Sequence, residues 1–136
     1  MELVLDTNVL VYDTLEDSEN HEKAKKIIDE AEIFCIPSVV AHEFVWVLLK
    51  KLNLDAEFIR KKVSEYLVED PRAKYTLESP QVIGRALRKL SEDKKSPTLL
   101  NDYIILETAT DLGLALATFD EELKRIALKH NVKTIP

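Results

Sequence analysis

The stretch Asn101–Leu123, NDYIILETATDLGLALATFDEEL, decides how this chain of 136 residues is interpreted. It carries the acid Asp102 at its start, continues in an apolar pattern typical of a helix, and reaches Gly113, a typical helix end. A short apolar run, Ala115–Phe119, follows and leads into Asp120. The stretch therefore predicts a helix and a buried strand, with carboxylates where the helix begins and the strand ends.

The beginning of the chain repeats this pattern, because the apolar run Glu2–Leu5 leads into Asp6. An apolar turn, Val9–Tyr12, is expected next. The other expected strands and helices follow in alternation: strands at 33–36, 75–78 and 132–135, and helices at 21–31, 39–52, 56–68, 80–90, 97–112 and 120–130. Short apolar strands that alternate with helices predict an α/β fold, a three-layer α/β/α sandwich with a mostly parallel central sheet, formed by residues 1–136 as a single domain.

The composition excludes several classes of site. The two glycines rule out glycine-rich phosphate loops, and the single cysteine, Cys35, rules out an internal disulfide and is expected in the core. The net charge of −6 argues against a protein that coats nucleic acid. No apolar run approaches the roughly 20 residues that span a bilayer, and the N-terminus does not resemble a signal peptide, so we expect a cytoplasmic protein without membrane contact.

Two of the acids follow predicted strands. Asp6 and Asp120 both stand just beyond the carboxyl end of a strand, which is the edge where open α/β sheets bind ligands. Each also has a local explanation, since Asp120 with Glu121 and Glu122 would make a good helix cap. Taken alone, neither acid identifies a functional site.

Two further acids lie on apolar helix faces. Glu43 has Val39, Val40, Trp46 and Val47 at neighbouring helical positions, and Asp102 shares its face with Ile105, Leu106 and Ala109. An unpaired buried carboxylate costs several kcal/mol. A salt bridge is the structural alternative for Glu43, and favourable interaction with the helix dipole is the alternative for Asp102.

Together the four acids predict one acidic pocket. Four carboxylates cannot ionise side by side without compensation, and oxygen ligands select hard cations such as Mg²⁺ or Mn²⁺. A metal-bound water can attack a phosphodiester while the metal steadies the leaving oxygen. Asn8 and Thr118 add neutral polar groups at the same edge of the predicted sheet.

The acids lie in motifs that resemble those of PIN-domain ribonucleases. The matching segments are Leu5–Leu10 around Asp6, Ser38–Phe44 around Glu43, Asn101–Ile105 around Asp102, and Leu116–Asp120 with its threonine. Their order and the length of the chain also fit, so the resemblance covers essentially the whole sequence. Two residues depart from the usual pattern: the bulky Tyr103 and the charged Glu107 stand where small residues are common.

A small protein of this kind resembles the VapC-type toxins of toxin–antitoxin modules. The resemblance implies an endoribonuclease that depends on Mg²⁺ or Mn²⁺ and hydrolyses RNA. By position, Asp6, Glu43, Asp102 and Asp120 would be catalytic metal ligands, and Asn8 and Thr118 supporting polar groups. It also implies a homodimer and a small antitoxin protein that blocks the site.

Other interpretations remain open at this point. A non-catalytic module that binds RNA or protein would keep the fold but has no use for inward carboxylates. A phospho-receiver domain requires adjacent acids after its first strand, and a haloacid-type phosphatase requires a second aspartate where Asn8 stands. Trp46 is expected in the core, His42 at the rim of the site, and His21 and His130 in solvent.

Overall fold

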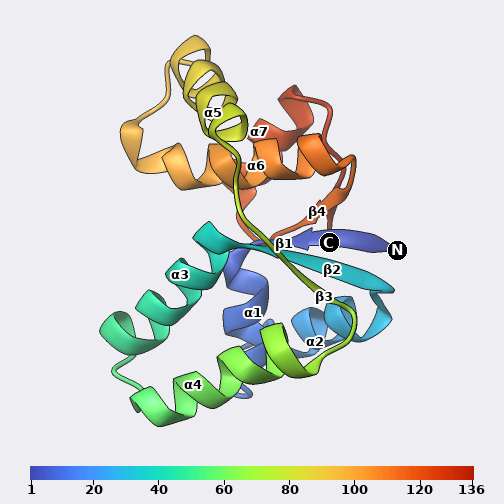
Figure 1. The fold of residues 1–136 in the computed structure, drawn as a ribbon, viewed down its shortest axis with the longest axis vertical. Helices are drawn as coiled ribbons and strands as arrows, with labels where there is room; N and C mark the ends of the chain where they lie inside the picture. The colour runs from blue at the N-terminus through green and yellow to red at the C-terminus, as the bar shows by residue number, and fades with distance from the viewer.

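The computed structural model describes all residues from Met1 to Pro136. Helices pack on both sides of a central sheet (Figure 1), so the predicted three-layer α/β/α sandwich is confirmed. The five strands are β1 (Glu2–Leu5), β2 (Ile33–Pro37), β3 (Ala73–Thr76), β4 (Ala115–Ala117) and β5 (Thr134–Ile135).

The sheet is parallel throughout, with the strand order β3-β2-β1-β4-β5. The first strand therefore lies at the centre, and β4 lies directly beside it. Leu5 of β1 pairs with Ala117 of β4. Because parallel strands end at the same edge, the residues after both strands emerge side by side.

The helices cover the two faces of the sheet in chain order (Figure 1). The first group is α1 (Thr7–Thr14), α2 (His21–Glu30), α3 (Ser38–Trp46), the π-helical turn η1 (Val47–Lys51), α4 (Ala56–Ser64) and the π-helical turn η2 (Glu65–Glu69). The second group is α5 (Pro80–Glu92), the 3₁₀ turn η3 (Pro97–Leu99), α6 (Leu100–Leu112) and α7 (Glu121–Lys129). The loop between β3 and α5 crosses from one layer to the other.

The helix boundaries follow the capping residues. Ser79 and Ser96 each cap a helical start that has proline at its first position, as the sequence predicts. Asp55 caps α4 by accepting two backbone N–H groups. Gly113 ends α6 with φ at +67°, a left-handed conformation that glycine adopts without strain.

One continuous cluster of 29 buried residues forms the hydrophobic core. Helix α6 is buried on most of its circumference: Tyr103, Ile105, Leu106, Glu107, Thr108 and Ala109 are all buried. A helix with so wide an inner face is fixed in position by its packing. The expectation that Cys35 lies in the core is confirmed.

Several boundaries differ from the sequence-based expectations. The segment predicted as an apolar turn, Val9–Tyr12, is part of the helix α1. The strand predicted at 75–78 lies at Ala73–Thr76, and β4 ends at Ala117 instead of Phe119. The prediction that Trp46 is a core residue was wrong, because 51% of it is exposed. No helix combines the length and apolar character that crossing a membrane requires.

Candidate functional site

The site lies at the carboxyl ends of the two central strands. Asp6 follows β1 directly and caps α1, accepting the backbone N–H of Thr7 at 2.7 Å. Asp120 stands three residues beyond β4 and caps α7, accepting the N–H groups of Glu122 and Leu123. Each acid is therefore held rigidly at the start of a helix, where the helix dipole favours its negative charge.

Thr118 connects the acids that follow the two strands. Its side chain is fully buried, and its hydroxyl donates to Asp6 Oδ2 at 2.7 Å. The Thr118 hydroxyl oxygen also accepts the backbone N–H of Asp120 at 3.0 Å. Asn8 accepts the N–H of Phe119 at 3.2 Å and lies 3.5 Å from the Thr118 hydroxyl. The structure thus brings both predicted supporting groups to the predicted sheet edge.

Glu43 reaches this edge from α3 and joins the two layers. One of its oxygens, Oε1, accepts the hydroxyl proton of Thr7 at 2.7 Å, and Oε2 accepts the side-chain amide of Asn101 at 3.2 Å. Thr7 begins α1 and Asn101 lies in the first turn of α6, so Glu43 ties together helices from opposite faces of the sheet. Sequence reasoning did not single out these two partners; their positions, next to Asp6 and Asp102, were the available signal.

Asp102 is the fourth acid, and its carboxylate accepts no hydrogen bond from the chain. Burial raises the pKa of Asp102 to about 7, and the negative charges of Asp6, Asp120 and Glu43 add to this effect. Burial likewise raises the pKa of Asp6 to about 6, although hydrogen bonds from Thr118 and Thr7 oppose the shift. The neighbouring acids therefore oppose ionisation of Asp6 and Asp102.

None of the four acids has a cationic partner. Fourteen ion pairs form in the protein, but none includes Asp6, Glu43, Asp102 or Asp120. The salt bridge considered as an alternative for Glu43 is therefore absent. No cationic side chain of the protein therefore balances the negative charge of these four acids.

The donor chemistry of this edge fits a hard divalent cation, because carboxylate oxygens dominate it and no cysteine or histidine takes part. In the arrangement seen, no three acidic, histidine or cysteine side chains stand close enough together to hold a metal ion. Water molecules would therefore have to complete the ligand set. Mg²⁺ in particular keeps several waters when few carboxylates bind it.

Comparison with protein families agrees with this arrangement. The family model described as the PIN domain matches residues 3–129. The chain belongs to the PIN domain family. Among characterised proteins, no sequence matches this PIN domain.

Solved structures share the fold. VapC20 from Mycobacterium tuberculosis, described as a sarcin-ricin loop cleaving toxin, aligns with a TM-score of 0.76 at 12% identity over 90% of this chain and 93% of that one. VapBC2 from Rickettsia felis, bound to a promoter DNA fragment, aligns with a TM-score of 0.70 at 19% identity, over 99% of this chain and 98% of that one. FitAcB from Neisseria gonorrhoeae aligns with a TM-score of 0.71 at 17% identity, over 98% of this chain and 96% of that one. At these identities the likeness establishes the fold.

The two residues that depart from the family pattern have partners inside this PIN domain. Tyr103 is fully buried, and its hydroxyl donates to Asp93 at 2.6 Å. His130 and Lys129 approach the same carboxylate, each at 2.7 Å, so the prediction that His130 is solvated was wrong. Burial opposes ionisation of Asp93, but these hydrogen bonds outweigh it and lower its pKa below the usual range. The cluster fixes the helix that carries Asp102.

Glu107 is the second departure, and two cations of α5 neutralise it. Its side chain is 2% exposed, with Arg85 Nε at 2.8 Å and Lys89 Nζ at 2.6 Å. Burial raises the pKa of Glu107, but the hydrogen bonds from Lys89 and Arg85 lower it further than burial raises it. The helices α5 and α6 are thus joined by ion pairs to a buried carboxylate.

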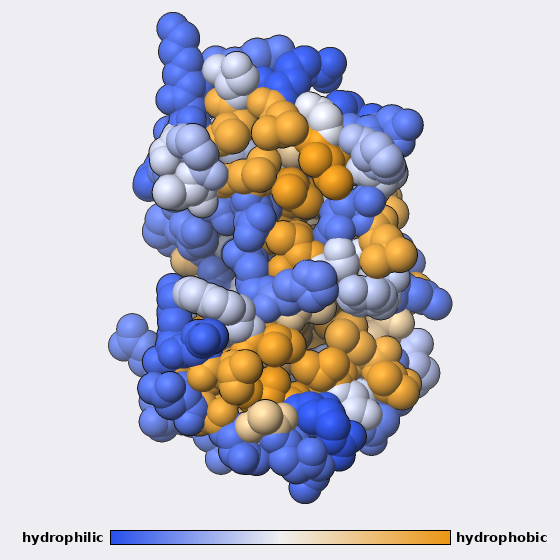
Figure 2. Space-filling view, turned by 60° about the vertical axis from the view of Figure 1, so that its left-hand side comes forward, coloured by the Kyte–Doolittle hydropathy of each residue, from blue (hydrophilic) through white to orange (hydrophobic).

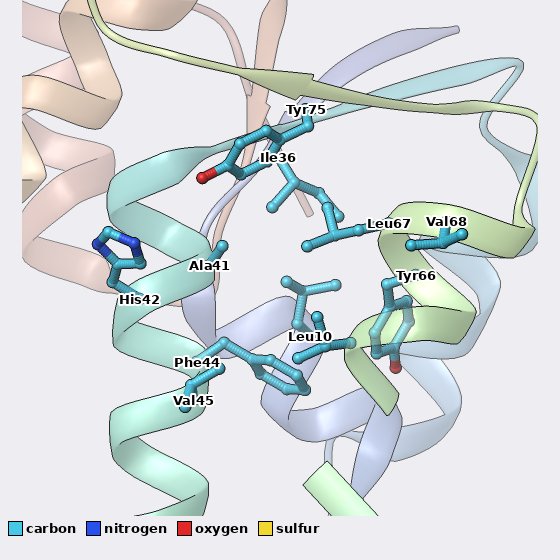
Figure 3. Close-up of a pocket in the computed structure, with 11 residues that line it drawn as sticks. Leu10, Ile36, Ala41, His42, Phe44, Val45, Tyr66, Leu67, Val68 and Tyr75 are labelled. Atoms are coloured by element: carbon cyan, nitrogen blue, oxygen red, sulfur yellow. The ribbon is translucent and has the colours of Figure 1, made fainter. Parts of the chain in front are cut away.

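An apolar groove lies between α3 and η2 of the PIN domain (Figure 3). It has a volume of about 410 Å³, and ten of its eleven lining residues are hydrophobic. Phe44 and Val45 of α3 face Tyr66 and Leu67 of η2 across it. His42, the neighbour of Glu43 in the chain, is an exposed residue on the rim of this groove and forms no hydrogen bond or ion pair with the four acids.

Proposed function

We propose that this PIN domain is an endoribonuclease that depends on Mg²⁺ or Mn²⁺ and hydrolyses RNA phosphodiesters. The observation that carries the proposal is the group of four carboxylates without a cationic partner. Such a group destabilises the metal-free fold, and a bound divalent cation would remove the destabilisation. RNA brings further negative charge, which a bound cation would also compensate at the site.

In this proposal Asp6, Glu43, Asp102 and Asp120 hold the metal, and water bridges it to those carboxylates that lie too far away for direct contact. When bound, the cation would lower the pKa of a coordinated water and polarise the phosphodiester. Asp102 is the most available ligand, since neither of its oxygens accepts a hydrogen bond from the chain. Deprotonation of Asp6 and Asp102, whose pKa values are raised to about 6 and about 7, must precede binding.

The neutral residues of the site position the acids. Thr118 holds Asp6 in one rotamer through its hydroxyl, and this bond also favours the ionised carboxylate. Thr7 and Asn101 hold the two oxygens of Glu43. Asn8 keeps the segment after β4 in place by accepting the backbone N–H of Phe119. Positioning of this kind reduces the reorganisation needed during the reaction.

We further propose that the chain is the toxin of a toxin–antitoxin pair and that it acts as a homodimer. Structures with the same fold include a toxin–antitoxin complex from Klebsiella pneumoniae and VapBC from Salmonella typhimurium bound to DNA. The apolar groove of Figure 3 would suit an amphipathic helix of the antitoxin, and its lining residue His42 directly precedes Glu43 in the chain. Apolar areas on the face in Figure 2 provide further surface for contact between chains.

The test is cleavage of a panel of single-stranded RNAs by the purified chain, free of any partner. Reactions would contain Mg²⁺, Mn²⁺ or EDTA and would include Asp102→Asn. The matched control is Asp111→Asn, which removes an exposed acid from the same helix. We expect metal-dependent cuts by the wild type and the control, and none by Asp102→Asn. Equal cleavage by all three proteins, or cleavage in EDTA, would refute the proposal.

One observation favours a second candidate, a non-catalytic module that binds RNA or protein. No three of the acids stand close enough together to hold a metal in the arrangement seen. This candidate predicts no change in stability and no heat of binding when Mn²⁺ is added. The ribonuclease proposal predicts both.

A further inference from the structure

Trp46 is the only tryptophan of the chain, and it is exposed over 51% of its surface. Tryptophan normally buries its large apolar ring. It stands three residues after Glu43 on α3, and residues three apart on a helix have their Cβ atoms about 5–6 Å from each other. The exposed indole therefore lies one helical turn from the acidic site, on the same helix face as Glu43.

A cation lies over the indole ring. Lys51 Nζ is 5.2 Å from the ring centroid, a distance typical of a cation–π contact. Residues five apart point about 140° away from each other on an α-helix, so Trp46 and Lys51 would not meet there. The turn Val47–Lys51 is π-helical, and its wider spacing brings residues five apart into register. The backbone irregularity thus creates the contact.

The charge of this segment contrasts with that of the whole protein. Between Ser38 and Leu54, Glu43 is the only acid, and Lys50 and Lys51 are two exposed cations. The chain as a whole has a net charge of −6. An exposed aromatic ring beside cations is the combination that binds single-stranded nucleic acid, because a base stacks on the ring and a phosphate meets the cation.

We propose that Trp46 and Lys51 form a stacking subsite for an unpaired base of the RNA, next to the nucleotide at the acidic site. The base would stack on the exposed part of the indole, and the Lys51 ammonium would meet the neighbouring phosphate. This inference rests on the proposed ribonuclease function. It adds a substrate requirement to that function: the RNA must be unpaired on the side of the cut that faces α3.

The single tryptophan makes the subsite directly observable, since all tryptophan fluorescence comes from this ring. The Asp102→Asn variant, which we expect not to cleave, would be titrated with a ten-nucleotide single-stranded RNA. A second titration would use an abasic oligonucleotide of the same length, which carries the phosphates without the bases. We expect quenching of the fluorescence by the RNA and little change with the abasic strand. Equal quenching by both, or by neither, would overturn the proposal.

Kinetics of the otherwise unchanged chain provide a second test. Base stacking on an aromatic ring strengthens RNA binding, so Trp46→Ala should raise KM about tenfold. Its kcat should stay near that of the wild type. Trp46→Phe should recover most of this loss. The matched control is Phe58→Ala, because Phe58 is also exposed beneath a lysine, with Lys62 Nζ 5.7 Å from the ring centroid. Its groove contains the acids Glu16, Asp17 and Asp55, which would repel RNA, so KM should not change.

These measurements separate the subsite from the proposed function. Cleavage with an unchanged KM for Trp46→Ala would refute the subsite and leave the ribonuclease standing. Quenching by RNA without any metal-dependent cleavage would support the subsite and refute the ribonuclease. Light scattering would reveal whether Trp46→Ala changes the oligomeric state. A dimer that dissociates in this variant would identify the ring as a contact between two copies and overturn the proposal.

Discussion

Replacing Asp102 with asparagine should stabilise the metal-free protein, although it removes a residue of the proposed site. The Asp102 carboxylate accepts no hydrogen bond from the chain, so the substitution removes a charge without breaking a contact. The pKa of Asp102 is raised from 3.8 to about 7 by burial and by neighbouring acids. Between these two values the folded state binds a proton that the unfolded state has lost, so stability decreases as pH rises. The variant lacks this decrease.

The size of the gain follows from the pKa shift. A shift from 3.8 to about 7 sets a ceiling of about 4 kcal/mol on the free energy of unfolding above pH 7. Solvent reaches this half-buried carboxylate and screens its interactions, so we expect about 1–2 kcal/mol. For a chain of this length that gain raises Tm by about 3–7 °C. At pH 4 the gain should vanish, because the carboxyl is then largely protonated in the folded protein.

The assay is urea unfolding of the wild type, Asp102→Asn and the control Asp111→Asn, at pH 4 and pH 8, with and without Mn²⁺. At pH 8 without metal, Asp102→Asn should be the most stable of the three. Mn²⁺ at a hundred times its dissociation constant should stabilise the wild type by about 2.7 kcal/mol and the variant much less. An Asp102→Asn protein that is less stable than the wild type at pH 8 would refute this reasoning.

Three further predictions concern the neighbours of the acids. Thr118→Val removes the hydrogen bond that lowers the pKa of Asp6, so the acidic limb of the pH–rate profile should move to higher pH; a profile that does not move would argue against this role. Glu107→Ala leaves two cations without their buried partner, so urea denaturation should show a free energy of unfolding lower by about 3 kcal/mol. For the control Asp111→Ala, which removes an exposed ion pair, the decrease should be less than about 1 kcal/mol. Because the pKa of Asp93 is lower in the folded than in the unfolded protein, its ionised carboxylate stabilises the fold at pH values above 3.8, the pKa in the unfolded chain. This contribution is lost as pH falls through the pKa of the folded protein. The free energy of unfolding of Asp93→Asn should therefore fall less steeply below about pH 4.

The sequence predicted the layers of the fold and the sheet edge where the acids meet. Short apolar strands and capping residues are local signals, and both Asp6 and Asp120 could be assigned to strand ends from them. The helix Thr7–Thr14 was not predicted, because its apolar residues form one consecutive run, Val9–Tyr12, and carry little helical periodicity. A segment buried on most sides has no polar face to mark its period.

The remaining differences arise from contacts between distant parts of the chain. Tyr103 and Glu107 looked like departures from a family pattern until their partners, Asp93 and the cations of α5, were located in space. Trp46 shares the face of Glu43 as expected, but that face reaches beyond the core at the end of α3. Periodicity indicates which residues share a face, but it does not indicate where the opposing surface ends.

The most direct test of the central claim is calorimetric titration of Mn²⁺ into the purified protein at pH 8. We expect saturable binding by the wild type and by Asp111→Asn, with an affinity at least tenfold weaker for Asp102→Asn. Binding of equal strength by all three proteins, or no binding by the wild type, would contradict the claim that these carboxylates form a metal site.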